Sequence, residues 1–401
     1  MGFDVGAVRA AYPALADGYA YLDGAAGTQV PAPVIEAIAE AYRGGLGNTG
    51  GVFPASDRSQ ELTDRCRAAI AALTGGQPGG VILGPSMTAL TYRLAGTLAR
   101  DWRPGDEVVV SRLDHDANVR PWVQAAERAG ATVRWAEPDP ASGEPPAAQY
   151  AVLLSPRTRL VAVTAASNII GTRPDVPAIT AAARAAGALS YVDGVHATPH
   201  GPTDMVALGA DFYATSAYKW SGPHLAAVVA DPGLLATLHP DKLRPAPAEA
   251  PDCFERGTLP FADLAGAAAA VEHLASLAGP AGGSSLRERV LAAMAEVAAY
   301  EQDLFAVLLG GLDALEHVTT YGKAASRTAT AFFNVEGRTP QEVAEHLARH
   351  RVNVWNGDNY AWELAGVLGI RESGSAVRAG LVHYNDRSDV DRLLTAVADL
   401  A

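Results

Sequence analysis

The chain contains few cysteines and no run of basic residues. Its two cysteines, Cys66 and Cys253, are far apart and in no metal-binding spacing, so neither a disulfide framework nor a structural zinc site is expected. Acidic residues outnumber basic ones by 44 to 31, giving a formal charge of −13, which argues against a nucleic-acid partner. The first residues lack the basic and apolar regions of a secretory signal, and charges and glycines interrupt the Ala-rich runs. We therefore expect a cytoplasmic protein without membrane spans.

The order of apolar and amphipathic segments predicts an α/β fold. With 401 residues and 49% hydrophobic content, the chain is long enough for two lobes. Between residues 81 and 231, short apolar runs such as EVVVS, RLVAVT and LSYVD alternate with amphipathic stretches, the pattern of a mostly parallel sheet covered on both faces. From about Phe261 long helical stretches predominate, followed by further strand-like runs. These predict a smaller α/β domain at the C-terminal end.

Polar residues follow several of the apolar runs, and in a parallel sheet such positions share one crevice. Ser86 and Thr88 follow VILGP and open a helix, where free backbone N–H groups favour a phosphate; a simple helix cap is the alternative for Ser86. Asp193, Lys219 and His115 each follow a strand-like run. A buried carboxylate needs a cation such as a protonated ring nitrogen, and a partly buried lysine has the lowered pKa that a Schiff-base amine requires. Each position alone has a structural explanation. Together, however, an anion-binding helix start, a carboxylate, an amine and an imidazole ring are the groups that pyridoxal 5′-phosphate (PLP) requires.

Five sequence blocks resemble the class V aminotransferase superfamily of fold-type I PLP enzymes, and most of all its cysteine desulfurase and selenocysteine lyase branch. They are SNIIGT, YVDGVH, TSAYK, FERGT and VRAGLVHYN, and the similarity extends from residue 21 to residue 385. The resemblance implies a large domain, residues 18–280, with a mostly parallel seven-stranded sheet. Residues 1–17 and 281–401 would form the smaller α/β domain, and two subunits would form a homodimer with shared active sites.

The resemblance also assigns roles around the cofactor ring. Lys219 would hold PLP covalently, and Asp193 would pair with its pyridine nitrogen. His115 would stack on the ring and serve as a proton shuttle. His196 stands where the family usually has glutamine and would make the same hydrogen bond to the phenolic oxygen.

The phosphate and the substrate have their own predicted residues. Four positions would hold the phosphate within the subunit: Ser86, the backbone of Met87, Ser216 and Tyr218. Thr258 in FERGT would reach the phosphate of the neighbouring subunit. Arg378 would bind the substrate carboxylate with both arms of its guanidinium, helped by Asn168.

The sequence departs from the family at the position of the sulfur-accepting cysteine. Desulfurases carry a mobile cysteine in the C-terminal domain that accepts sulfur as a persulfide, but no cysteine follows Cys253 here. The run VWNGDNYA instead places Tyr360 at or near that position. Tyr218 and Met87 also replace a usual histidine and a usual threonine. We expect an intact scaffold without the persulfide step, in which Tyr360 protonates a leaving group, shapes the pocket or only packs.

These features favour a PLP-dependent lyase that cleaves the C–S bond of a cysteine-derived substrate by β-elimination, without persulfide transfer. Transamination, epimerisation and decarboxylation coupled to oxidative deamination are alternatives on the same scaffold. A non-catalytic descendant of the fold is a third possibility, against which the joint presence of the proposed catalytic and binding residues argues.

Two other motifs are set aside. Gly45, Gly47 and Gly50 match a dinucleotide-binding pattern but follow a helix-like stretch rather than a strand, so an NAD-dependent oxidoreductase is a remote alternative. His346 and His350 lie four residues apart on a predicted helix without a third ligand. We therefore expect no bound metal.

Overall fold

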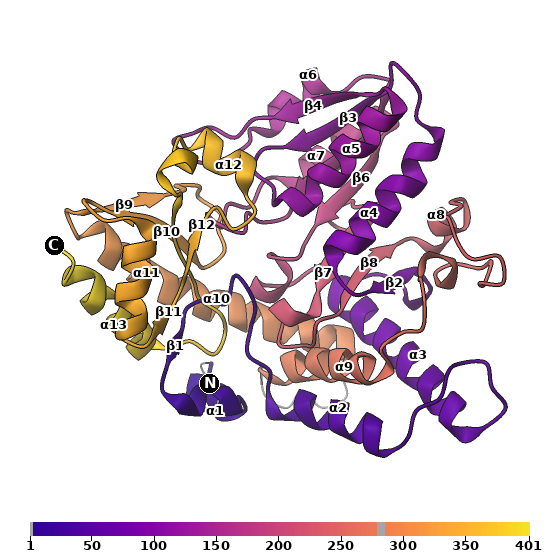
Figure 1. Cartoon of the computed structure of the whole chain (residues 1–401), viewed down its shortest axis with the longest axis horizontal. Coiled ribbons are helices and arrows are strands. Elements are labelled where there is room, and N and C mark those ends of the chain that lie inside the picture. The colour runs from indigo at the N-terminus through magenta and orange to yellow at the C-terminus, as the bar shows by residue number, and fades with distance from the viewer. Residues whose placement is uncertain (1–2, 279–284) are drawn as a thin grey trace.

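A seven-stranded mixed sheet forms the centre of the larger part of the molecule (Figure 1). The protein is represented by a computed structural model, which describes residues 3–278 and 285–401. The strand order is β2-β8-β7-β6-β5-β3-β4, and β8 runs antiparallel to both of its neighbours whereas the other pairs are parallel. The expected mostly parallel sheet of seven strands is confirmed. Its strands are β2 (Val81–Gly84), β3 (Glu107–Ser111), β4 (Thr132–Ala136), β5 (Thr158–Thr164), β6 (Leu189–Asp193), β7 (Phe212–Ser216) and β8 (Ala226–Ala230).

Helices cover both faces of this sheet, which explains why its strands are continuous apolar runs. In β3, Val108 and Val110 pack in one apolar cluster with residues of α4 (Met87–Leu98) and α5 (Arg120–Ala129). Val109 points to the opposite face, because successive side chains of a strand alternate. The helices that contribute to that second cluster include α2 (Ala32–Arg43), α3 (Pro54–Thr74), α7 (Val176–Ala185), α9 (Phe261–Ser276) and the first half of α10 (Leu286–Asp313).

A four-stranded antiparallel sheet forms the centre of the C-terminal part, as predicted for a smaller α/β domain. Its order is β12 (Trp355–Gly357), β13 (Ala376–Gly380), β10 (Thr330–Val335) and β9 (Val318–Tyr321). Three helices pack against it through a separate apolar cluster: α10 (Leu286–Asp313), α11 (Pro340–Arg349) and α13 (Arg387–Ala398). The remaining helices are short: α1 (Val5–Ala10), α6 (Tyr150–Leu153), α8 (Pro232–Ala236) and α12 (Trp362–Val367).

The beginning of the chain lies against this C-terminal part (Figure 1). Strand β1 (Ala20–Tyr21) pairs in parallel with β11 (Val352–Asn353). The division into residues 18–280 and residues 1–17 with 281–401 stays a prediction, and its boundary at 280/281 lies outside the described residues. Within the described ranges, no helix combines the length and apolar character needed to cross a membrane.

Cys253 is buried although it follows a Pro-rich stretch of the chain. Its place after the Pro-rich stretch 243–252 suggests an exposed side chain, yet only 4% of the residue is exposed. A single turn of 3-10 helix, Asp252–Phe254, directs Cys253 and Phe254 into the cluster beneath α4 and α5. Packing, rather than composition, decides which side chains near this stretch are buried.

Candidate active site

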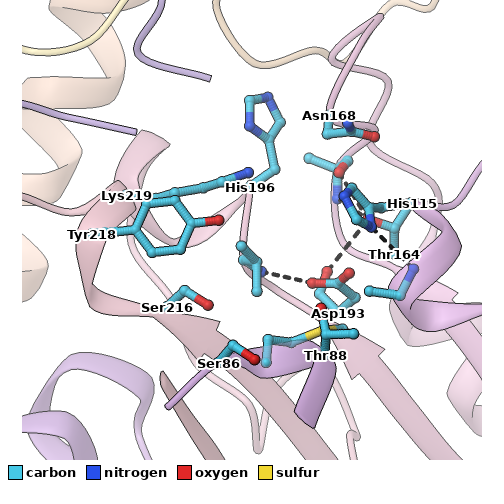
Figure 2. A pocket seen from close by; sticks show the side chains of 14 residues that line it. Ser86, Thr88, His115, Thr164, Asn168, Asp193, His196, Ser216, Tyr218 and Lys219 are labelled. Atoms are coloured by element: carbon cyan, nitrogen blue, oxygen red, sulfur yellow. Dashed lines mark hydrogen bonds between the residues drawn. The ribbon is translucent and has the colours of Figure 1, made fainter. Parts of the chain in front are cut away.

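The carboxyl ends of five strands surround one pocket in the large sheet (Figure 2). Most residues singled out from the sequence line it: Ser86, Met87, Thr88, His115, Asn168, Asp193, His196, Ser216, Tyr218 and Lys219. They come together because β2, β3, β5, β6 and β7 all point the same way and end at the same edge. Their individual roles remain predictions.

Lys219 and Asp193 are both buried in this pocket, and burial shifts the pKa of each toward neutrality. Lys219 ends a short 3-10 turn after β7 and is 6% exposed. Burial lowers the pKa of its amine to about 7, and the Arg378 guanidinium acts in the same direction. Burial raises the pKa of Asp193 to about 6, partly offset by the Val195 N–H, which donates to Oδ1 over 2.9 Å. The pocket thus contains an amine that is about half neutral at pH 7 and a carboxylate that a cationic ring nitrogen would stabilise.

Three hydroxyl groups and the N-terminus of α4 line one side of the pocket. Ser86 caps α4, with its Oγ accepting a hydrogen bond from the Ala89 N–H over 3.1 Å. Figure 2 shows Ser86 and Thr88 on the same side of the pocket as Ser216. The capping bond expected of Ser86 is therefore present. It leaves the first turn of a 12-residue helix facing the pocket, which is a favourable position for an anion.

Two neutral imidazoles line the pocket. His115 Nδ1 accepts a hydrogen bond from the Ala117 N–H over 3.0 Å, so the ring proton lies on Nε2. Burial lowers the pKa of His115 to about 3 and that of His196 well below its usual value. His196 Nε2 is 3.1 Å from the Thr328 hydroxyl and 3.0 Å from that of Thr330, while its buried Nδ1 has no partner among the described residues. Sequence reasoning missed both threonines, which lie more than 130 residues beyond His196 and give no local signal.

A second cavity of about 380 Å³ adjoins the first. It shares His115, Asn168, Tyr218 and Lys219 with the first pocket, and Arg378 and residues 355–360 complete it. Arg378 is 4% exposed and donates to the Asn168 carbonyl over 3.0 Å. Burial lowers its pKa to about 10, so it stays charged. Among the described residues no carboxylate lies within ion-pair distance of its guanidinium, which leaves a buried cation facing an open cavity.

Tyr360 and Thr258 lie away from the centre of the pocket. Tyr360 is 72% exposed at the rim of the second cavity, with its ring stacked at 5.4 Å on His115. Thr258 is exposed and lines neither of these cavities in its own chain. Its expected contact with a partner subunit stays a prediction.

The residues present fit PLP. The pocket offers an amine with a lowered pKa for the aldehyde, an acid for the ring nitrogen, and hydroxyls with a helix N-terminus for the phosphate. The model of the aminotransferase class-V family matches residues 20–393. The chain belongs to this family. Its members depend on PLP, and the protein is therefore a PLP-dependent enzyme of the lyase and transferase type.

The chain is similar to known proteins along nearly its whole length. The chain is 36% identical to an uncharacterized protein of Mycobacterium tuberculosis over the full length of both. It is 33% identical to a probable cysteine desulfurase of Pseudomonas putida, covering 97% of this chain and 96% of that one. The crystal structure of the Escherichia coli cysteine desulfurase CsdA is similar to this class V protein, with a TM-score of 0.88 and 26% identity. The match covers 100% of this chain and 99% of the CsdA chain.

Proposed function

We propose that this protein is a PLP-dependent lyase that cleaves the C–S bond of a cysteine-derived amino acid by β-elimination, without passing sulfur through a protein persulfide. The observation that carries the proposal is the position of the two cysteines. Cys66 is fully buried in α3, where burial raises the pKa of its thiol to about 12, and Cys253 is 4% exposed in the large domain. Neither lines either of the two cavities. Sulfur transfer by a desulfurase needs a thiolate at the substrate.

The site has the groups that an elimination requires. PLP, when bound, stabilises negative charge at the substrate Cα. Arg378 and Asn168 would hold the substrate carboxylate, and Asp193 would keep the ring nitrogen protonated. Lys219 would be the base that removes the Cα proton, because its amine lies in the same pocket and has a pKa of about 7. The electron pair from that bond then expels sulfur from Cβ as a thiolate, and hydrolysis gives a keto acid and ammonia.

Two assays test the proposal. The purified protein should have a visible absorption band that borohydride reduction removes, leaving the cofactor attached to Lys219 by mass spectrometry. With S-substituted cysteines, we expect keto acid, ammonia and thiol in equal amounts. Alanine together with a protein persulfide would identify a desulfurase. Keto acid without thiol, with the amino group retained on the cofactor, would identify an aminotransferase.

We also propose that the enzyme is a cytoplasmic homodimer in which Thr258 of each subunit contacts the phosphate bound to the other. The exposed position of Thr258 in FERGT is consistent with this arrangement. Its test is argued in the Discussion.

A further inference from the structure

Residues 355–360 line one side of the second cavity, and the chain continues from them to residue 364 at the large domain. This segment, called the 355–364 segment below, begins in β12 at the edge of the small sheet and ends in the first turn of α12. Its first six residues line the cavity, with the exposed aromatic rings of Trp355 and Tyr360 among them. The wall therefore consists of aromatic and amide or carboxylate groups rather than a nucleophile.

Glu363 connects this segment to the large domain by two ion pairs. Its carboxylate pairs with Arg112 and, over 3.0 Å, with Arg120. Arg112 directly follows β3 and Arg120 is the first residue of α5, so the two arginines flank the loop that carries His115. The Glu363 side chain is 13% exposed, so water screens the pairs less than it would at a fully exposed site.

Backbone and apolar contacts act at the same place. The Asp116 N–H donates to the Tyr360 carbonyl over 2.7 Å, and Asn168 Nδ2 donates to the Asn359 carbonyl over 2.8 Å. Ala361 and Leu364, on either side of Glu363, are fully buried in a cluster that includes Leu113, Ile169 and Ile170 of the large domain. Three kinds of contact thus fix the segment to the loop that carries His115.

The backbone of the segment is in a conformation that needs such support. Asn359 and Tyr360 have φ values of 49° and 61°, in the left-handed region that is unfavourable for a tyrosine. Surrounding contacts must therefore stabilise it. The result is a Tyr360 ring lying 5.4 Å from the His115 ring and inclined to it by 23°.

We propose that Glu363 is a positioning residue that holds the 355–364 segment against the loop that carries His115. It thereby fixes the position of the side chains that contact the sulfur substituent of the substrate. Resting on the proposed function, this wall would select cysteines that carry a large substituent on sulfur, because a cavity of about 380 Å³ extends beyond the amine and the carboxylate site. Such a substituent would pack on the rings of Trp355 and Tyr360.

The test compares Glu363→Gln with a matched control, Glu272→Gln. Glu272 also pairs with an arginine, Arg65, over 3.1 Å, but on the exposed surface between α3 and α9. In Glu363→Gln we expect hydrogen exchange in residues 355–364 to rise about ten-fold. KM for a cysteine with a bulky S-substituent should rise about ten-fold, with kcat and the KM of a small substrate within about three-fold. In Glu272→Gln, hydrogen exchange in residues 355–364 and the KM for the bulky substrate should both stay at their wild-type values.

Unchanged exchange in Glu363→Gln would overturn the positioning role, and faster exchange with unchanged KM would overturn the role in substrate selection. Arg120→Gln provides a second variant if Glu363→Gln folds poorly, because it leaves the pair with Arg112 and should give an intermediate effect. The exchange measurement does not depend on the reaction. A wild-type enzyme that cleaves no C–S bond, with a loosened segment in Glu363→Gln, would refute the proposed function and support the positioning role.

Discussion

The Tyr12 hydroxyl lies 2.6 Å from Nε2 of His383, joining the beginning of the chain to its C-terminal part. The same hydroxyl is 2.8 Å from Ser221 Oγ and 3.0 Å from His273 Nε2. Burial lowers the pKa of His273 to about 4 and that of His383 to about 3, so both rings are neutral at pH 7. Ser221 follows Lys219 by two residues and has a left-handed φ of 69°. Hydrogen bonds between uncharged groups therefore connect the segments of Tyr12, His273 and His383 to the loop that carries Lys219.

Replacing Tyr12 with phenylalanine should destabilise the protein. The change leaves Ser221 and two histidines buried without their common partner, which costs about 1–3 kcal/mol. Urea denaturation of Tyr12→Phe would measure the loss, with Tyr42→Phe as control, because Tyr42 is 68% exposed. Equal stability of the two variants would show that the cluster contributes nothing to folding.

The sequence predicted the large sheet because its strands are short apolar runs, as in Val108–Val110, and it predicted much of the pocket because parallel strands end at one edge. It could not predict the contacts between segments that are far apart. Tyr12 and His383 are separated by 371 positions, and Arg112 and Glu363 by 251. Neither pair leaves a periodic signal in its own neighbourhood. Only the folded arrangement reveals the wall that Glu363 supports.

The pH dependence of cofactor capture should report the pKa of Lys219. Only the neutral amine attacks an aldehyde, and burial lowers the pKa of this amine to about 7 from 10.5. Below pH 7 the amine is mostly protonated, so capture slows as pH falls. The rate at which the cofactor-free protein gains its absorption band should rise about ten-fold from pH 6 to pH 8 and then level off. A rate that kept rising to pH 10 would mean that the amine is not perturbed.

Arg378→Lys should weaken substrate binding while leaving the fold intact. The substitution keeps the positive charge but removes the planar guanidinium group, which can bind a carboxylate through two parallel hydrogen bonds. We expect a loss of about 1.5–3 kcal/mol in substrate affinity, the contribution of a hydrogen bond to a charged group. Titration of the cofactor spectrum with substrate would measure it. An unchanged affinity would indicate a substrate without an α-carboxylate.

Thr258→Ala should retain the cofactor less well without losing the dimer. Loss of one hydrogen bond to a charged phosphate corresponds to about 1.5–3 kcal/mol, or about ten- to hundred-fold weaker PLP binding. Dialysis followed by absorption measurements gives the retention, and light scattering gives the mass. A stable monomer with full activity would contradict both the shared site and the role of Thr258.

The double variant Cys66→Ala/Cys253→Ala should turn over the best substrate within about two-fold of the wild-type rate, because β-elimination uses no protein thiol. Burial raises the pKa of both thiols, that of Cys66 to about 12, so little thiolate exists near pH 7. Lys219→Ala provides the contrast, since it should lose both the absorption band and turnover. Truncating the buried Cys66 should cost about 1 kcal/mol of stability, so folding and bound PLP are checked first. If activity disappears from a folded, PLP-loaded double variant, or if mass spectrometry finds a persulfide on either wild-type cysteine after turnover, sulfur passes through the protein and the lyase proposal is wrong.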